Sequence, residues 1–332
     1  MEKNYLTKHR QLTLLIGLHG LAMSNAVADD IDLSHSLTVD GHYLNTDDDD
    51  AFDWNGLYQF DLSHTLNERL TLNGGAFLAT TNHPSAVIGD RQGFSNIESS
   101  DPLALTAFNL TYRNDDTRVL VGAFDENSEF AGVNVAGNFL NSSMGYSPTL
   151  THFISYPEAA TGLVIDSKLS ANASIKAAYL TRELSFGDQQ HLNAEFEWQP
   201  NAGSRIVAGL SDGHWYGVGE TRLVRMEAWD WHGFLQWGDN NRYADFQRHL
   251  GMGIVVNSTT NDLSFGLATT AAKTQRDVTE QVWELYARWQ VTDSIALQPD
   301  VQWITSDHDV VVTGSDYPDD DVAVTMRMVL TW

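Results

Sequence analysis

Polar and apolar residues alternate one by one along most of this 332-residue chain. In the stretch IDLSHSLTVDGHYL (31–44), most apolar side chains fall on odd positions and polar ones on even positions. The same alternation recurs in segments 57–66, 191–198, 283–291, 294–303 and 324–332. A period of two is typical of a β-strand with one apolar and one polar face. The pattern therefore predicts an all-β fold.

Connections of two kinds separate the predicted strands. Short ones occur at 66–69, 113–117, 170–173, 200–204, 257–262 and 291–294, and long ones at about 45–56, 80–102, 125–160, 212–221, 239–245, 272–279 and 306–321. Short periplasmic turns and long external loops are typical of outer-membrane β-barrels. Counting back from the last strand gives about sixteen antiparallel strands, provided that 228–231 is a turn and 125–160 is one connection.

Aromatic residues collect at the ends of the predicted strands, as at Trp283, Trp289, Trp303 and Trp332. Transmembrane barrels carry such girdles where their outer face meets the two membrane interfaces. A soluble β-sandwich or jelly roll is the alternative, but these folds usually show fewer and less regular strands. We therefore predict a transmembrane barrel with its apolar side chains toward lipid and its polar side chains toward the lumen.

The first 28 residues differ from the rest. Three basic residues precede the apolar run LTLLIGLHGLAM, and the small-residue sequence AVA (26–28) follows it. This is the pattern of a secretory signal peptide, so residues 1–28 are expected to be removed and residues 29–332 to form the barrel. A buried N-terminal helix is the alternative. The run is too short to cross a bilayer as a helix, which takes about 20 residues.

The chain is strongly acidic, with 19 Lys and Arg against 44 Asp and Glu, a formal net charge of −25. Nucleic acid and anionic membrane surfaces are poor partners for it, because binding either requires positive charge at the contact. The chain has no cysteine, so an exported protein of this sequence must be stabilised by other means than disulfides.

The polar face of the predicted strands lines the lumen and carries both charge signs. A cluster of Glu284, Arg327 and Asp300 is expected on neighbouring strands, either as structural pairing or in contact with solute. The wall residues that we single out are Glu195, Glu197, Arg225, Glu284, Arg288, Asp300, Gln302 and Arg327.

The segment 125–160 breaks the alternation. Long connections without regular structure are usually functional or disordered, and the apolar residues of this one, such as Phe130 and Phe139, need a surface to pack on. We predict that it folds into the lumen as a constriction loop; a loop packed over the mouth is the alternative. The residues expected at the constriction are Asp125, Glu126, Asn127, Glu129 and Asn141.

Two blocks of the sequence resemble the carbohydrate-selective porin family typified by the glucose porin OprB. The first, within 119–169, runs VLVGAFDENSEFAGVNVAGNFLNSSMGYSPTL and continues to YPEAATGLVI. The second, within 246–332, includes TEQVWELYARWQVTDSIALQPDVQW and the last strand with Arg327. The resemblance implies a sixteen-stranded outer-membrane porin for small carbohydrates, with an in-folded constriction loop.

The chain departs from this family pattern in its acidity, its short length and its final Trp332, where Phe is commoner. A strongly negative pore favours cations. The alternative function is therefore a general or cation-preferring porin without sugar selectivity. The identity of the sugar and the choice between monomer and trimer are not predicted.

No enzyme, cofactor or metal is expected. No G-x-S-x-G nucleophile elbow occurs, and the histidines lack the paired spacing of zinc ligands. The acidic runs 46–50 and 316–321 could bind calcium, but such runs are more often solvated loop tips. The expected location is the outer membrane of a Gram-negative bacterium, with lipids, lipopolysaccharide and the barrel-assembly machinery as further partners.

Overall fold

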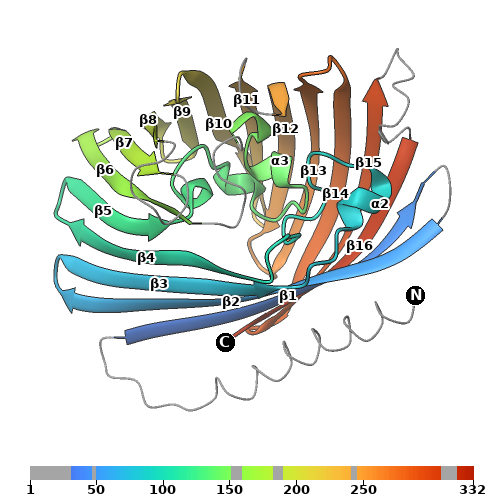
Figure 1. Cartoon of the computed structure of the whole chain (residues 1–332), viewed down its shortest axis with the longest axis horizontal. Helices are drawn as coiled ribbons and strands as arrows, with labels where there is room; N and C mark the ends of the chain where they lie inside the picture. Colours follow the sequence, from blue (N-terminus) through green and yellow to red (C-terminus); the bar gives the residue numbers. More distant parts are fainter. Residues whose placement is uncertain (1–30, 47–49, 151–158, 182–189, 241–244, 308–319) are drawn as a thin grey trace.

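The alternating segments form the wall of a closed antiparallel β-barrel in this computed structural model (Figure 1). The structure describes residues 31–46, 50–150, 159–181, 190–240, 245–307 and 320–332. Within these residues, sixteen strands pair in chain order, and β1 (Ile31–Asn45) closes the ring against β16 (Asp320–Thr331). The predicted sixteen-stranded barrel is confirmed.

The remaining strands follow the chain, and a few helical turns lie between them. The strands are β2 (Asp50–Asn67), β3 (Leu70–Ala79), β4 (Leu103–Arg113), β5 (Thr117–Phe124), β6 (Ala160–Ser170), β7 (Ala173–Thr181), β8 (Gln190–Asn201), β9 (Ser204–Ser211), β10 (His214–Arg225), β11 (Trp229–Asp239), β12 (Phe246–Ser258), β13 (Leu263–Thr274), β14 (Thr279–Thr292) and β15 (Ile295–Asp307). The helical turns are α2 (Pro84–Ile88), η1 (Glu126–Ser128), η2 (Asn134–Ala136), α3 (Ser142–Gly145) and η3 (Pro148–Leu150).

The two faces of the wall follow the sequence alternation. On β14, Glu284 and Tyr286 are buried inside the barrel, while Trp283 and Leu285 between and beside them are 45% and 46% exposed on its outer face. This arrangement suits a wall between lipid and lumen, because the apolar face meets the lipid and the polar face meets the interior. Each strand satisfies its backbone groups through hydrogen bonds to its neighbours. The outward tryptophans include the predicted Trp283, Trp289 and Trp303.

Two of the predicted long connections are shorter than expected. The connection at 45–56 shrinks to 46–49, because Asn45 pairs with Asp50 and both strands extend further than the alternation indicated. The connection at 212–221 is a two-residue turn, since Asp212 and Gly213 both have positive φ. Asp-Gly at such a turn is a strong hairpin signal, which the assignment from alternation overlooked.

The two connections on which the strand count depended lie close to their predicted places. β10 ends at Arg225 and β11 begins at Trp229, and a single connection joins Phe124 of β5 to Ala160 of β6. The first strand also meets the last residue: the backbones of His35 and Trp332 exchange two hydrogen bonds of 3.1 Å, and their rings stack with centroids 5.6 Å apart.

Some sequence predictions fall outside the described residues. These are the leader 1–28 and most of the acidic runs 46–50 and 316–321. Among the described residues, no helix is long and apolar enough to cross a membrane.

Candidate functional site

The connection after β5 lies against the inner wall and is attached to it by wall carboxylates. Three glutamates from different strands each accept a hydrogen bond from a backbone N–H of this segment. The bonds run from Ala131 to Glu195 at 2.9 Å, from Val135 to Glu220 at 2.8 Å and from Asn141 to Glu284 at 3.0 Å. Hydrogen bonds to charged acceptors are stronger than neutral ones, so much of the wall's negative charge holds the segment in place.

Apolar side chains of the same segment fill the space above this wall. Phe139 meets Tyr286 and Phe234 edge to face, with ring centroids 4.9 and 5.9 Å apart. Phe130 packs into a separate cluster with the inward residues Leu120 and Val164. These contacts supply the inner surface that the apolar residues of the segment were expected to need.

A second segment, 80–102, also folds inside the barrel. Its Phe94 is fully buried beside His42 of the wall, and Glu280 accepts hydrogen bonds from Arg91 and Gln92 backbone N–H groups at 3.1 and 3.0 Å. The expectation of a single in-folded loop is therefore wrong. Few residues of this segment are apolar, and it packs against the first inner segment, 125–150, as well as against the wall.

The two inner segments bind each other as well. The backbone N–H of Asn96 donates to the carbonyl of Leu140 at 2.8 Å, and that of Ser142 donates to the carbonyl of Gly93 at 2.8 Å. Gly93 has a φ of +74°, and a Cβ there would lie 2.9 Å from Ser142 Oγ. Only glycine fits this close approach without strain.

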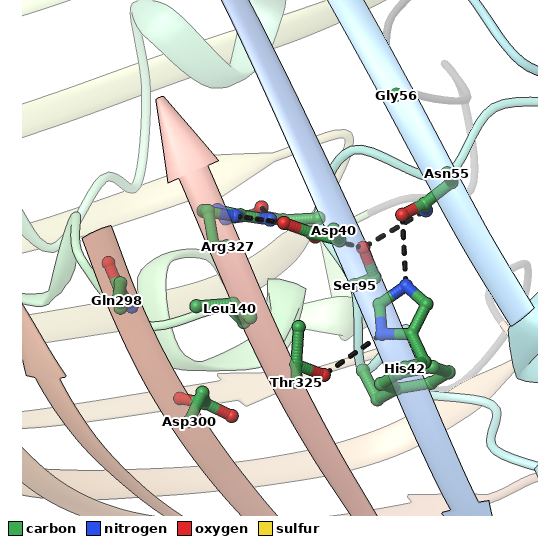
Figure 2. A network of polar contacts seen from close by, with 12 residues as sticks. Asp40, His42, Asn55, Gly56, Ser95, Leu140, Gln298, Asp300, Thr325 and Arg327 are labelled. Carbon is green, nitrogen blue, oxygen red and sulfur yellow. Dashed lines mark hydrogen bonds and ion pairs between the residues drawn. The ribbon is translucent and has the colours of Figure 1, made fainter. Parts of the chain in front are cut away.

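Figure 2 shows the polar network where the barrel closes. The Arg327 guanidinium donates to both carboxylate oxygens of Asp40 at 2.7 Å, and Ser95 of the second inner segment donates to Asp40 at 3.0 Å. His42 joins the network through Asn55 and Thr325, each at 2.9 Å. The network ties the first strand, the last strand and an inner segment together.

The structure brings the predicted cluster of Glu284, Arg327 and Asp300 together, since Asp300 interacts with both Glu284 and Arg327. The three side chains lie on neighbouring strands, but the ion pair of Arg327 is with Asp40, its direct cross-strand partner. Sequence analysis assigned Asp40 to the polar face without knowing which strands meet at closure. Figure 2 places Asp300 to one side of this pair.

The inner segments leave one side of the lumen open. A cavity of about 350 Å³ follows the inner face of β2, β3, β4 and β5 and reaches the start of the first inner segment. Its lining combines amides, hydroxyls, both charge signs and two phenylalanines. The residues are Leu57, Gln59, Asp61, Asn73, Phe77, Thr106, Ala107, Asn109, Thr111, Arg113, Arg118, Leu120, Phe124, Asp125, Ser128 and Glu129.

A charged pair connects the wall of this cavity to the inner segment. Arg118 of β5 donates from both terminal nitrogens to the Glu129 carboxylate, one of these bonds being 2.9 Å long, and lies 3.9 Å from Asp166. Lys176 of β7 donates to the backbone carbonyl of Glu129 and lies 5.2 Å above the Phe130 ring. Glu129 is therefore fixed at the cavity edge with its charge balanced.

Asp125 begins the inner segment and borders the cavity. Its carboxylate accepts the Asn127 backbone N–H at 3.0 Å and so caps η1. Burial, together with the negative charges of Glu126 and Glu129, raises the pKa of Asp125 to about 6. The group thus titrates just below neutral pH.

The structure separates the predicted constriction residues into two groups. Asp125 and Glu129 line the cavity, whereas Glu126 is buried and bound by His191 at 3.0 Å and by Asn193. Asn141 is also buried and held by Glu284 and Gln302. Asn127 donates its backbone N–H to the cap of η1 and is not a lining residue of the described cavity.

Four of the eight predicted wall residues, Glu195, Glu284, Gln302 and Arg327, form hydrogen bonds with the inner segments. Glu195, Glu284, Asp300 and Gln302 are buried beneath these segments, and Gln302 donates to the Phe94 carbonyl at 2.7 Å. The others lie toward the rim or take part in ion pairs: Glu197 pairs with Arg205 at 2.7 Å, Arg288 is partly buried, Arg327 pairs with Asp40, and Arg225 is exposed at the end of β10.

Several residues of the cavity were not predicted from the sequence, and for Arg118 the reason is physical. The polar Asn109, Thr111 and Arg113 alternate with apolar neighbours on β4 and were detectable. Arg118 was not, because the inward side of β5 is otherwise apolar where it packs under Phe130. Among the described residues, no group of three or more His, Cys, Asp or Glu could hold a metal ion.

Comparison with known proteins agrees with this architecture. The family model for the carbohydrate-selective porins of the OprB family matches residues 249–330, within the second block of the sequence resemblance. The chain is similar to the high-pH structure of Pseudomonas putida OprB, with a TM-score of 0.74, 13% identity, and coverage of 91% of this chain and 94% of that chain. No curated protein matches the chain.

Other solved porins share the fold at lower similarity. The low-pH structure of Pseudomonas putida OprB has a TM-score of 0.62 at 14% identity and covers 91% of this chain and 93% of that chain. The anion-selective porin from Comamonas acidovorans also has a TM-score of 0.62, at 9% identity, with 91% and 99% covered. At such identities the likeness concerns the fold.

The closed sixteen-strand barrel, with its polar lumen and the segments packed inside it, has the fold of the solved porins. Among these, the OprB family is the one whose model matches the last quarter of the chain, and the barrel as a whole is similar to that of OprB.

Proposed function

We propose that this protein is an outer-membrane porin through which small carbohydrates diffuse passively along the cavity of β2–β5. The observation that carries the proposal is this cavity, lined largely by polar side chains and lying, among the described residues, beside two inner segments that are anchored to the wall. Its volume of about 350 Å³ falls within the roughly 300–1,000 Å³ range of small-molecule sites.

The chemistry of the lining suits sugars. Asn73 donates to Asn109 at 2.9 Å and to Thr111 at 3.2 Å, which makes a ladder of amides and hydroxyls on the wall. Phe77 and Phe124 border the same cavity, and aromatic rings offer flat apolar faces to the C–H groups of a sugar. Selectivity would come from channel width and wall hydrogen bonds rather than from a deep pocket.

The acidity of the sequence does not by itself make a cation-selective pore. Several lumen acids are occupied by the inner segments, namely Glu195, Glu220, Glu280 and Glu284. The general or cation-preferring porin nevertheless remains the alternative to be tested, because Asp61 and Asp125 border the open path.

The proposal includes no catalytic step. In the described part of the chain, the buried hydroxyl of Ser147 lies 3.0 Å from His249 Nδ1, but the other ring nitrogen faces the Thr270 hydroxyl at 2.6 Å. A nucleophile that is buried and lacks an orienting carboxylate does not make a hydrolytic site. Porin barrels typically act as channels, and we assign this one the same role.

Export and assembly belong to the proposal too. A leader of residues 1–28 would direct the chain to the periplasm, and the C-terminal Trp332, paired with the first strand, would be presented to the barrel-assembly machinery. Outer-membrane lipids and lipopolysaccharide would surround the apolar outer face.

Planar-bilayer recording tests the function. Glucose and small oligosaccharides added in millimolar amounts should reduce the single-channel conductance, because they occupy the polar path and displace ions. Swelling of proteoliposomes in isosmotic glucose should exceed that of empty liposomes. Cation selectivity without any sugar-dependent block or swelling would favour the general porin instead.

A further inference from the structure

The negative charge of the cavity is concentrated at one level. Asp61 pairs with Gly75, Gly75 with Ala107, and Ala107 with Phe124, the residue before Asp125. Asp61 and Asp125 therefore border the cavity near one row of the β-ladder, on opposite sides of it. The basic lining residues, Arg113 and Arg118, lie at the other end of the described cavity, beside the 114–116 turn.

The positive charges of both basic residues are balanced by carboxylates close to them. Arg118 pairs with Glu129 and lies 3.9 Å from Asp166. Arg113 is exposed at the end of β4, in a depression that also contains Asp115 and Asp116. No ion pair of the described residues involves Asp61 or Asp125. The two carboxylates thus leave this level of the cavity with uncompensated negative charge.

A second feature at the same level points to a polar ligand. A Cβ on Gly75 would lie 2.5 Å from Thr106 Oγ1 and 2.8 Å from Asp61 Oδ1, so the missing side chain lets both oxygens approach the same point over the glycine. Thr106 Oγ1 is shielded from solvent and has no hydrogen-bond partner among the described residues. A hydroxyl without a partner beside a carboxylate suits the N–H or O–H groups of a solute.

We propose that Asp61 and Asp125 make this channel favour cationic amino sugars over neutral sugars, and both over anionic sugars such as uronic acids. The inference rests on the proposed carbohydrate function and adds a charge class to it. The ammonium group of the solute would lie between the two carboxylates, while its hydroxyl groups meet the amides and hydroxyls of the wall. The Phe77 and Phe124 rings bound the same space.

The selectivity acts by local enrichment rather than tight binding. A carboxylate about 5 Å from a unit charge in water changes its local concentration by a factor of roughly three to four. Because each group enriches the cation and depletes the anion, it changes the cation-to-anion ratio by about tenfold. Two such groups should therefore separate cationic from anionic sugars of equal size by about a hundredfold in rate at low ionic strength. Salt weakens the effect, since the Debye length falls from about 30 Å at 0.01 M to about 3 Å at 1 M.

Tracer uptake into proteoliposomes tests the proposal. Labelled glucosamine, glucose and glucuronate are supplied at equal trace concentrations in one buffer, so that no bulk counter-ion limits entry. The expected order of rates is glucosamine, glucose, glucuronate. Asp61→Asn and Asp125→Asn should each reduce the glucosamine-to-glucuronate ratio by about tenfold, and the double variant should reduce it to near unity.

The matched control is Asp277→Asn, which removes the same charge from an exposed residue outside the cavity, between β13 and β14. This control should leave the glucosamine-to-glucuronate ratio unchanged. Slower migration in gel electrophoresis after heating than before heating should show that each variant is folded. Equal rates for the three sugars would overturn the charge preference, and so would a glucosamine-to-glucuronate ratio that is unchanged in the double variant. Entry of glucose would in either case still support the porin function. Failure of all three to enter faster than into empty liposomes would instead overturn the carbohydrate function.

Discussion

The residues at the cavity have two roles: some hold the inner segment in place, and others face the cavity. Glu126 and Glu129 resembled Asp125 in the sequence as carboxylates at the start of a long connection. Contacts distinguish them, because Glu126 is bound by His191 and Asn193 and Glu129 by Arg118. Of these three, only Asp125 keeps a carboxylate at the cavity without an ion pair among the described residues, so its titration should be visible in permeation.

The first prediction concerns the pH dependence of ion selectivity. The pKa of Asp125 is raised from a usual value near 3.8 to about 6, chiefly by burial. The side chain is thus neutral at pH 4.5 and charged at pH 7.5, so the preference for K⁺ over Cl⁻ should rise between these limits. Reversal potentials in a KCl gradient measure this. Asp125→Asn should flatten the curve around pH 6; an unchanged curve would assign the titration to another group.

The same shift has a consequence for stability. A carboxyl whose pKa is raised on folding binds its proton more tightly in the folded state than in the unfolded chain. Its contribution to stability is therefore fully present below pH about 3.8 and is lost as the pH rises through about 6. Asp125 is thus kept at the cavity at some cost in stability, as expected of a functional group.

At the scale of elements, the wall strands were predictable and the inner segments only partly so. Strand alternation reflects a local rule, since one face meets lipid and the other the lumen. The segment 125–160 was recognised by its apolar residues. The segment 80–102 was not, because its buried Ile88, Phe94 and Ile97 are spread among polar residues. Its place depends on contacts with the first segment, which no local pattern reveals.

The second prediction is that deletion of Gly132–Ser143 enlarges the pore. The deleted residues include the donors to Glu220 and Glu284 and the Phe139 ring between β11 and β14. Water would then occupy that side of the lumen, and single-channel conductance should increase about twofold or more, since a sixteen-stranded barrel is wide enough for an aqueous channel.

Planar-bilayer recording compares the deletion with a milder variant, Glu284→Gln, which keeps the shape of the side chain but turns one of the two oxygens that accept the Leu140 and Asn141 N–H groups into a donor. Its mean conductance should stay near that of the parent channel, with more frequent brief openings to the larger level. A deletion variant that is folded and conducts like the parent would show that the segment lies outside the conducting path.

For the whole molecule, closure of the ring joins residues 287 positions apart, Asp40 and Arg327. Sequence alternation placed both on the polar face but could not show that they face each other, because their meeting depends on the strand number and on the register of β1 against β16. Asp40 is fully buried and Arg327 is 7% exposed. A buried ion pair of this kind adds little net stability, but removal of one partner is strongly destabilising because it leaves the other charge buried and unpaired.

The third prediction follows from this burial. Arg327→Met leaves the Asp40 charge buried without its partner and should lower the free energy of unfolding by about 3–5 kcal/mol. The double variant Asp40→Leu/Arg327→Met removes both charges and should recover most of that loss. Urea unfolding in detergent, followed by tryptophan fluorescence, measures both. The control Lys273→Met breaks the exposed pair with Asp277 and should cost less than about 1 kcal/mol. If Arg327→Met costs no more than this control, the pair does not contribute to closing the barrel.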